Sequence, residues 1–111
     1  MKIYQYKIKE VDRVIDGDTV DVFIDLGFDI IVKKRIRLYG INTPEIRTRN
    51  KKEKELGYKA KNAISHLLYS SEELYLDSIG IGKYGRVLGI IRNEHCDIND
   101  YLVEKGYAER V

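Results

Sequence analysis

The 111-residue chain is poor in several residue types, and each shortage excludes a kind of site. Cys96 is the only cysteine, so neither an intramolecular disulfide nor a cysteine-based zinc site can form. The two histidines, His66 and His95, have no second histidine or cysteine at ligand spacing, which favours a structural role for both. Tryptophan is absent, and Pro44 is the only proline.

Long apolar runs are also missing. No stretch approaches the length of a membrane span, so we expect no membrane association. The first residues, MKIYQYKIKE, do not resemble a signal peptide, so we expect a cytoplasmic protein, or a secreted one if a leader has been removed. With 43% hydrophobic and 34% charged residues, we expect residues 1–111 to form one soluble domain with a single core.

Basic residues are concentrated in one segment. Residues 33–61 hold eleven Lys or Arg and three Glu, a local net charge of +8, whereas the whole chain carries only +2. This asymmetry suggests an anionic partner such as nucleic acid, although a solvated, lysine-rich helix face would give the same pattern. Arg47, Arg49, Lys51 and Lys52 form a basic loop that could steer a polyanion.

Apolar residues alternate with polar ones through the first forty residues. Residues 1–15 read as one long, bent strand, and the Asp16-Gly17 turn, of type I′ or similar, leads into a second strand around Val20–Ile24. Residues 29–40 give a third strand. Arg37 lies near its end and must face solvent, a groove or an acidic site, because an unpaired arginine cannot face an apolar core.

The spacing of apolar residues changes after residue 40. Residues 41–52 read as a polar loop, and from about Glu53 to Leu68 apolar residues recur with helical spacing. Residues 72–77 and 86–93 read as strands around a glycine-rich loop at 78–85, and residues 97–106 as a short helix. The order β-β-β-α-β-β-α predicts an α+β fold, a five-stranded OB-fold barrel with helices.

Three short constellations carry polar residues that this fold does not need. They are Asp16-Gly17-Asp18-Thr19, Arg37 with Asn42-Thr43-Pro44-Glu45, and Lys83-Tyr84-Gly85-Arg86. Each taken alone is explained by an ordinary turn or a helix start. Together they supply hard oxygen ligands suited to Ca²⁺, two guanidinium groups for one phosphate and a carboxylate that could activate water. Phosphodiester hydrolysis needs this combination.

The chain resembles the staphylococcal nuclease family. The resemblance rests on VIDGDTV, RIRLYGINTPE, GYKAKNAISHLL, KYGRVLGII and INDYLVEKGYAERV, which occur in the family's order and cover almost the whole chain. It implies a calcium-dependent nuclease acting on DNA or RNA, with single strands preferred and products that carry a 3′-phosphate and a 5′-hydroxyl.

The resemblance also implies roles for individual residues. Asp18, Asn42 and the backbone carbonyl of Thr43 would bind the metal, with Asp16 supporting Asp18. Arg37 and Arg86 would bind phosphate, and Glu45 would act as the general base. Lys83 and Tyr84 would contact a terminal phosphate of the bound nucleotide. Besides Tyr84, Tyr39 is the tyrosine best placed for stacking on a base.

Two departures from the family pattern bear on this expectation. Asn42 stands where staphylococcal nuclease has a metal-binding aspartate, which predicts weaker metal affinity because the site loses one negative charge. The sequence also stops at Val111, before the family's further tyrosines and third helix, which predicts a more open groove.

Alternatives to a nuclease remain open. One is an OB-type module that binds nucleic acid and has lost catalysis, and another is a protein-interaction domain whose basic loop docks an acidic partner. Retention of Arg37, Glu45 and Arg86 favours the enzyme. We expect a monomer, with a dimer as the alternative.

Overall fold

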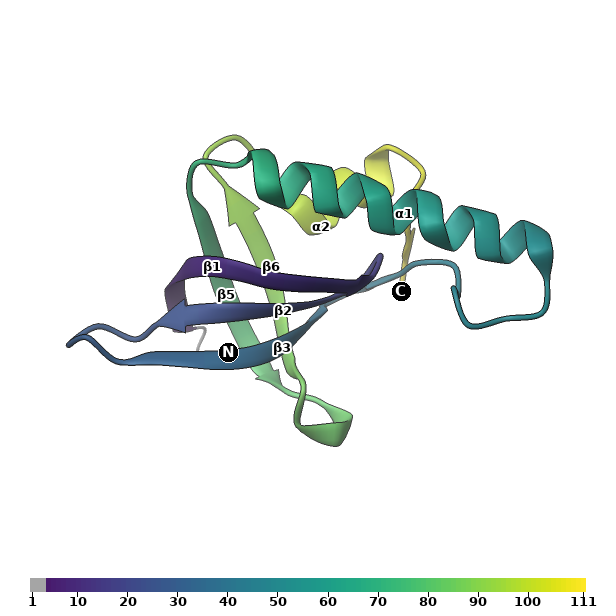
Figure 1. Cartoon of the computed structure of the whole chain (residues 1–111). Coiled ribbons are helices and arrows are strands. Elements are labelled where there is room, and N and C mark those ends of the chain that lie inside the picture. The colour runs from purple at the N-terminus through teal and green to yellow at the C-terminus, as the bar shows by residue number, and fades with distance from the viewer. Residues whose placement is uncertain (1–3) are drawn as a thin grey trace.

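A five-stranded closed barrel forms the body of the protein. The structure, a computed structural model, describes residues 4–111. The barrel strands are β1 (Tyr4–Asp16), β2 (Thr19–Asp25), β3 (Ile31–Leu38), β5 (Leu74–Ile81) and β6 (Val87–Asn93), joined in the order β1-β2-β3-β6-β5 (Figure 1). Together with two helices this is an α+β architecture, and it confirms the predicted OB-fold barrel.

The long strand β1 belongs to both sides of the barrel. Tyr4–Ile8 pairs with β5, and Lys7–Asp16 pairs with β2 through a register that shifts three times. Such irregularities bend a strand and increase its twist, which a small barrel needs for closure. The predicted bend in the first strand is therefore confirmed, although the part of that prediction on residues 1–3 lies outside the described residues.

The barrel closes through a short parallel pairing. Ile36–Leu38 of β3 runs beside Val87–Gly89 of β6. Buried branched side chains from every barrel strand fill the interior, among them Val20, Val22, Ile36, Leu76 and Ile91. Because side chains alternate across a strand, the residues that flank Ile36 and Val87 project from the outer surface of the barrel.

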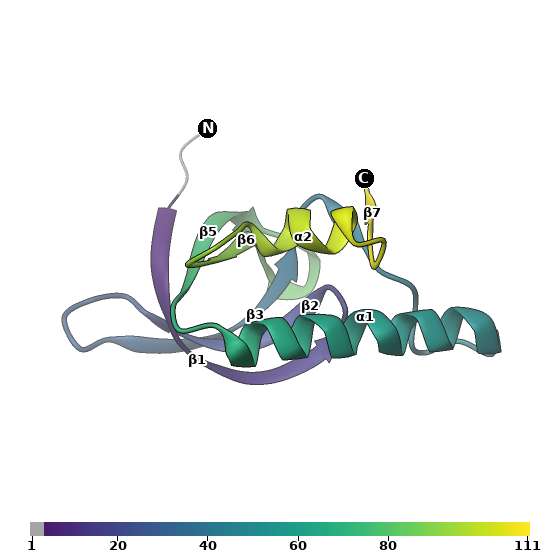
Figure 2. The same ribbon diagram turned by 90° about the horizontal axis from the view of Figure 1, so that it is seen from above.

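The two helices lie side by side over one part of the barrel (Figures 1 and 2). Helix α1 (Lys51–Ser70) begins at Asn50, whose side-chain oxygen accepts a hydrogen bond from the Glu53 N–H at 3.1 Å. It buries Gly57, Ala60, Ile64 and Leu68. Helix α2 (Ile98–Glu104) is capped in the same way by Asp97. Within residues 4–111, no helix has the length and apolar character needed to cross a bilayer.

The structure corrects several local predictions. The segment 41–52 is not wholly a loop, because β4 (Ile41–Asn42) pairs with β7 (Glu109–Arg110) and α1 begins at Lys51. Strand β5 continues to Ile81, so the predicted glycine-rich loop is half strand. Its remainder contains a 3₁₀ turn at Lys83–Gly85. The β4–β7 pairing joins distant segments and leaves no local periodicity. The end of β5 lies in the local β5–β6 hairpin, where Ile81 pairs with Val87, but Gly80 and Gly82 interrupt the strand pattern there.

Candidate active site

The turn between β1 and β2 places a buried carboxylate at the end of the barrel. The Asp18 N–H donates to Asp16 Oδ1 at 3.1 Å, and the Thr19 hydroxyl donates to Asp18 Oδ1 at 3.1 Å. Asp18 is only 9% exposed. The turn is not of type I′, because φ is not positive at Gly17 or Asp18.

Gly17 is needed for space rather than for its backbone angles. A Cβ at this position would lie 2.7 Å from the Ala60 Cβ and 2.8 Å from the Thr43 Oγ1. Glycine therefore lets the turn pack directly against both α1 and the segment that follows β3.

Asp18 contacts both that second segment and strand β3 itself. The Thr43 N–H donates to Asp18 Oδ2 at 3.1 Å, and the Arg37 Nη2 lies 3.3 Å from the same oxygen. Arg37 also donates from Nη2 to Asn42 Oδ1 at 2.6 Å. Of the three surroundings predicted for Arg37, namely solvent, a groove or an acidic site, the contact with Asp18 shows the acidic one.

These contacts test whether the residues suit a calcium ion. The Asp18 and Asn42 side-chain oxygens, from two distant segments, both lie against one positively charged nitrogen. Carboxylate and amide oxygens of this kind are accepted Ca²⁺ ligands. Thr43 meets Asp18 through its N–H, whereas the resemblance implies a role for its carbonyl. Within residues 4–111, no three Asp, Glu, His or Cys side chains gather at one point, so a cation here would need amide, carbonyl or water ligands.

The pKa of Asp16 reflects the crowding of acidic groups in the turn. Burial, together with the hydrogen bond and negative charge of Asp18, raises the pKa of Asp16 to about 6. A positive charge beside the turn would favour the ionised form of Asp16. Both the negative charge of the turn and the positions of its oxygen atoms are therefore suited to a bound cation.

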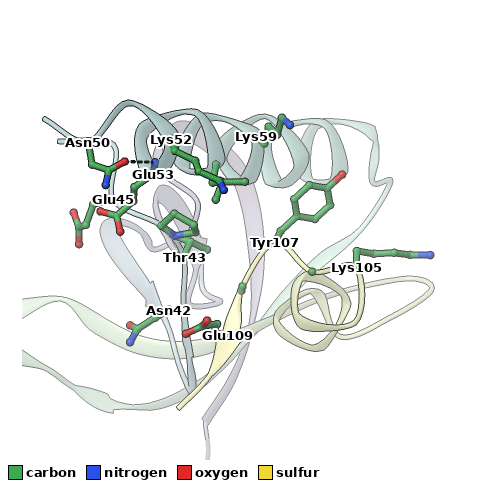
Figure 3. A pocket seen from close by; sticks show the side chains of 14 residues that line it. Asn42, Thr43, Glu45, Asn50, Lys52, Glu53, Lys59, Lys105, Tyr107 and Glu109 are labelled. Atoms are coloured by element: carbon green, nitrogen blue, oxygen red, sulfur yellow. Dashed lines mark hydrogen bonds between the residues drawn. The ribbon is translucent and has the colours of Figure 1, made fainter. Parts of the chain in front are cut away.

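Asn42, Thr43 and Glu45 line one groove of about 710 Å³ between the first half of α1 and the segment after α2 (Figure 3). Glu45 is exposed to solvent in this groove. Its backbone lies against α1 at Gly57, where a Cβ would be 2.8 Å from the Pro44 carbonyl oxygen and 3.0 Å from that of Glu45. Gly57 thereby sets how closely the helix approaches the loop that carries Glu45.

The third predicted constellation lies on a separate part of the surface. Arg86, Tyr84 and Gly85 line a shallow hollow together with Arg35, and none of them lines the groove. The Arg86 guanidinium stands 5.9 Å from the Tyr84 ring centre, and Tyr84 is 93% exposed. Lys83 is exposed in the same turn. The structure records no contact that joins Lys83, Tyr84 or Arg86 to Asp18 within residues 4–111.

Arg86 nevertheless has an unused hydrogen-bonding group. Its Nε is buried and has no partner among the described residues. The β3–β6 register places Arg86 beside Arg35, on the outer surface from which Arg37 also projects. The two predicted phosphate-binding arginines therefore share one face of the barrel.

Sequence reasoning missed several residues that hold these parts together. Asn99 is buried, and its amide donates to the carbonyls of Tyr39 at 2.9 Å and Gly89 at 3.2 Å. Arg35 forms a two-pronged ion pair with Asp21, at 2.7 and 3.0 Å, which lowers the pKa of Asp21. No local pattern marks an asparagine in a helix as buried, whereas the β2–β3 alternation could have indicated that Asp21 and Arg35 share a face.

Comparisons with known proteins agree with this architecture. A family described as "Staphylococcal nuclease homologue" matches residues 35–111. Protein ParB of Escherichia coli is 34% identical over 82 residues, which are 74% of this chain and 40% of that protein. An uncharacterized protein of Methanocaldococcus jannaschii is 30% identical over 128 aligned residues, 95% of this chain and 59% of that protein.

A third relative is a micrococcal nuclease from Shigella flexneri. It is 27% identical over 108 residues, which cover 89% of this chain and 55% of the nuclease. The chain thus spans between 40% and 59% of the length of these relatives.

Proposed function

The chain belongs to the staphylococcal nuclease homologue family, and from this premise we propose that it is a calcium-dependent nuclease acting on DNA, RNA or both. One observation carries the proposal. Asp18 and Asn42 both contact the Arg37 guanidinium, the Thr43 N–H donates to Asp18, and Thr43 and Asn42 share a groove with Glu45. A cation ligand set, a phosphate-binding group and a carboxylate for water activation therefore lie on adjoining segments.

In the proposed reaction Glu45 accepts a proton from a water molecule as that water attacks phosphorus. The bond from phosphorus to the 5′ oxygen breaks, that oxygen takes up a proton from solvent water, and the phosphate stays on the 3′ side. Bound calcium would supply charge stabilisation at a phosphate oxygen. Glu45 suits its role because it is exposed in the groove, where a water and a substrate can both reach it.

Arg37 would bind a phosphate oxygen and stabilise the charge that develops in the transition state. It contacts two of the proposed cation ligands, so the phosphate it binds would adjoin the cation. Arg86 would add a second guanidinium from the same face of the barrel, and its buried, unpaired Nε is consistent with a ligand-binding role. Lys83 and Tyr84, both exposed, would contact the more distant part of a nucleotide.

We further propose a preference for single strands, because a flexible backbone fits a groove more readily than a stiff duplex does. The charge supports a polyanionic substrate. Arg47, Arg49, Lys51 and Lys52 are exposed beside the groove, and Lys52 lines it.

The test is cleavage of denatured DNA and of RNA, with Ca²⁺ and with a chelator. We expect calcium-dependent cutting that falls by roughly 10²- to 10⁴-fold in Glu45→Gln. Glu53→Gln is the matched control, since Glu53 lines the same groove from α1, and it should cut at the wild-type rate.

Two results would count against the proposal. Absence of cutting at millimolar Ca²⁺, with nucleic acid still bound, would identify a binding module that lacks catalysis. Full activity in Glu45→Gln would remove Glu45 from the mechanism.

A further inference from the structure

Glu109 lies directly across from Asn42 in the small β4–β7 sheet. Asn42 pairs with Glu109, and Ile41 with Arg110, in antiparallel register. Side chains of directly opposed residues project from the same face, with Cβ atoms about 4.5–5.5 Å apart. Both side chains line the groove that holds Thr43 and Glu45, and Figure 3 shows them next to each other.

Hydrogen bonds on both sides of Glu109 fix the position of its backbone. The Ala108 N–H donates to the Leu102 carbonyl at 3.1 Å, and the Val111 N–H donates to the Gly40 carbonyl at 2.9 Å. The neighbouring Arg110 is paired with Asp100 at 2.8 Å. The orientation of β7 is thus determined, and Glu109 is the residue of this strand that lines the groove.

The site around Asn42 has few negative charges, which leaves a role for the Glu109 carboxylate. Asp18 is the carboxylate in contact with Thr43 and Arg37, while Asn42 contributes a neutral oxygen. Affinity for Ca²⁺ rises with the number of carboxylates at the site. Glu109 is exposed, and the described part of the chain gives its carboxylate no ion pair.

We propose that Glu109 is part of the cation site and supplies, through the water shell of the ion, the negative charge that Asn42 does not. The inference rests on the proposed function, because it concerns the calcium that the nuclease would use. The site then draws charge from the β1–β2 turn and from the strand after α2, and a neutral oxygen from the segment after β3.

The experiment is a calcium titration by calorimetry in the absence of nucleic acid. Glu109→Gln should bind Ca²⁺ about five- to tenfold more weakly than the wild type, as expected for the loss of one charge beside a divalent ion at an exposed site. The matched control is Glu104→Gln, which makes the same change of net charge at an exposed residue outside the groove. It should change the affinity less than twofold.

A second pair of variants separates a local charge effect from a change in structure. Adding Asn42→Asp to Glu109→Gln should recover most of the lost affinity, because it returns a carboxylate to the opposite strand. Melting temperatures measured without calcium should agree among the wild type, Glu109→Gln and Glu104→Gln, since both altered side chains are exposed.

The outcomes distinguish the two proposals. If the wild type binds calcium, Asp18→Asn abolishes binding, and Glu109→Gln binds like Glu104→Gln, then Glu109 is not part of the site but the proposed function stands. If the wild type binds no calcium at millimolar concentration, the calcium dependence of the proposed function fails, and the role of Glu109 fails with it.

Discussion

Replacing Gly57 by alanine should both destabilise the protein and slow its reaction. Glycine inside a helix ordinarily costs about 0.5–1 kcal/mol relative to alanine, so helix propensity alone predicts that Gly57→Ala is stabilising. The new Cβ would, however, lie 2.8 Å from the Pro44 carbonyl oxygen and 3.0 Å from the Glu45 carbonyl oxygen. Both atoms belong to the backbone of the loop that carries the proposed general base.

The size of the effect follows from these distances. Ordinary van der Waals contact begins near 3.4 Å, so helix and loop must separate by about half an ångström. Overpacking of this kind costs about 1–3 kcal/mol, which outweighs the propensity gain and leaves a net loss of about 1 kcal/mol. Since a 1 Å misplacement can cost about a hundredfold in rate, we expect cleavage to slow by about tenfold.

Urea denaturation and single-strand cleavage are the two assays. Asn62→Ala is the control, because Asn62 lies exposed on the same helix and alanine raises helix propensity there without a new contact. It should be slightly stabilised and fully active. A Gly57→Ala protein that is as stable as Asn62→Ala and cuts at the wild-type rate would refute the reasoning from close approach.

Four further predictions follow from other contacts. Asn99→Ala should lower the free energy of unfolding by about 2–3 kcal/mol in urea denaturation, because it removes three hydrogen bonds and takes this acceptor from the buried Ile91 N–H; a loss below 0.5 kcal/mol, roughly the effect of an ordinary surface change, would contradict this. Asp21→Asn should cost about 1 kcal/mol at pH 7 by the same measurement. Because Arg35 lowers the pKa of Asp21, the contribution of this pair is complete above about pH 4 and is lost as the pH falls through the folded-state value. Wild-type and variant stabilities should therefore converge once the pH lies below that folded-state value, and a constant difference would show that the ion pair is not its source. Asn42→Asp should bind Ca²⁺ more tightly than the wild type in a calorimetric titration, and equal affinities would show that charge at this position is unimportant. Raising the salt concentration from about 50 to 200 mM should slow cleavage if the basic loop steers substrate, and a rate independent of salt would exclude that steering.

The fold could be predicted largely from sequence because its signals are local. Alternation through β2 and the end of β3 marks these strands, and Leu56 to Leu68 repeat with helical spacing in α1. The positions of Asp16 and Gly17 mark the hairpin turn in the same way. The parallel closure of β3 on β6 and the β4–β7 pairing have no local signature, since neither changes the periodicity of its strands.

The candidate site was predictable in composition rather than in arrangement. The three constellations contain Asp18, Arg37, Glu45 and Arg86, and the family resemblance assigns each a role. Packing of the barrel and helices decides which of them meet. Asp18 contacts Arg37 and Thr43, whereas Arg86 lies in a hollow with Arg35 and Tyr84.

The sequence by itself determined the barrel strands, the helices and the chemical types of the polar residues, because these depend on neighbours a few positions apart. Only the tertiary structure decided that Gly17 and Gly57 must lack a side chain, since the atoms that crowd them come from other segments. It likewise placed Glu109 opposite Asn42. Contacts between distant parts of a chain depend on how the whole core packs, and periodicity does not record them.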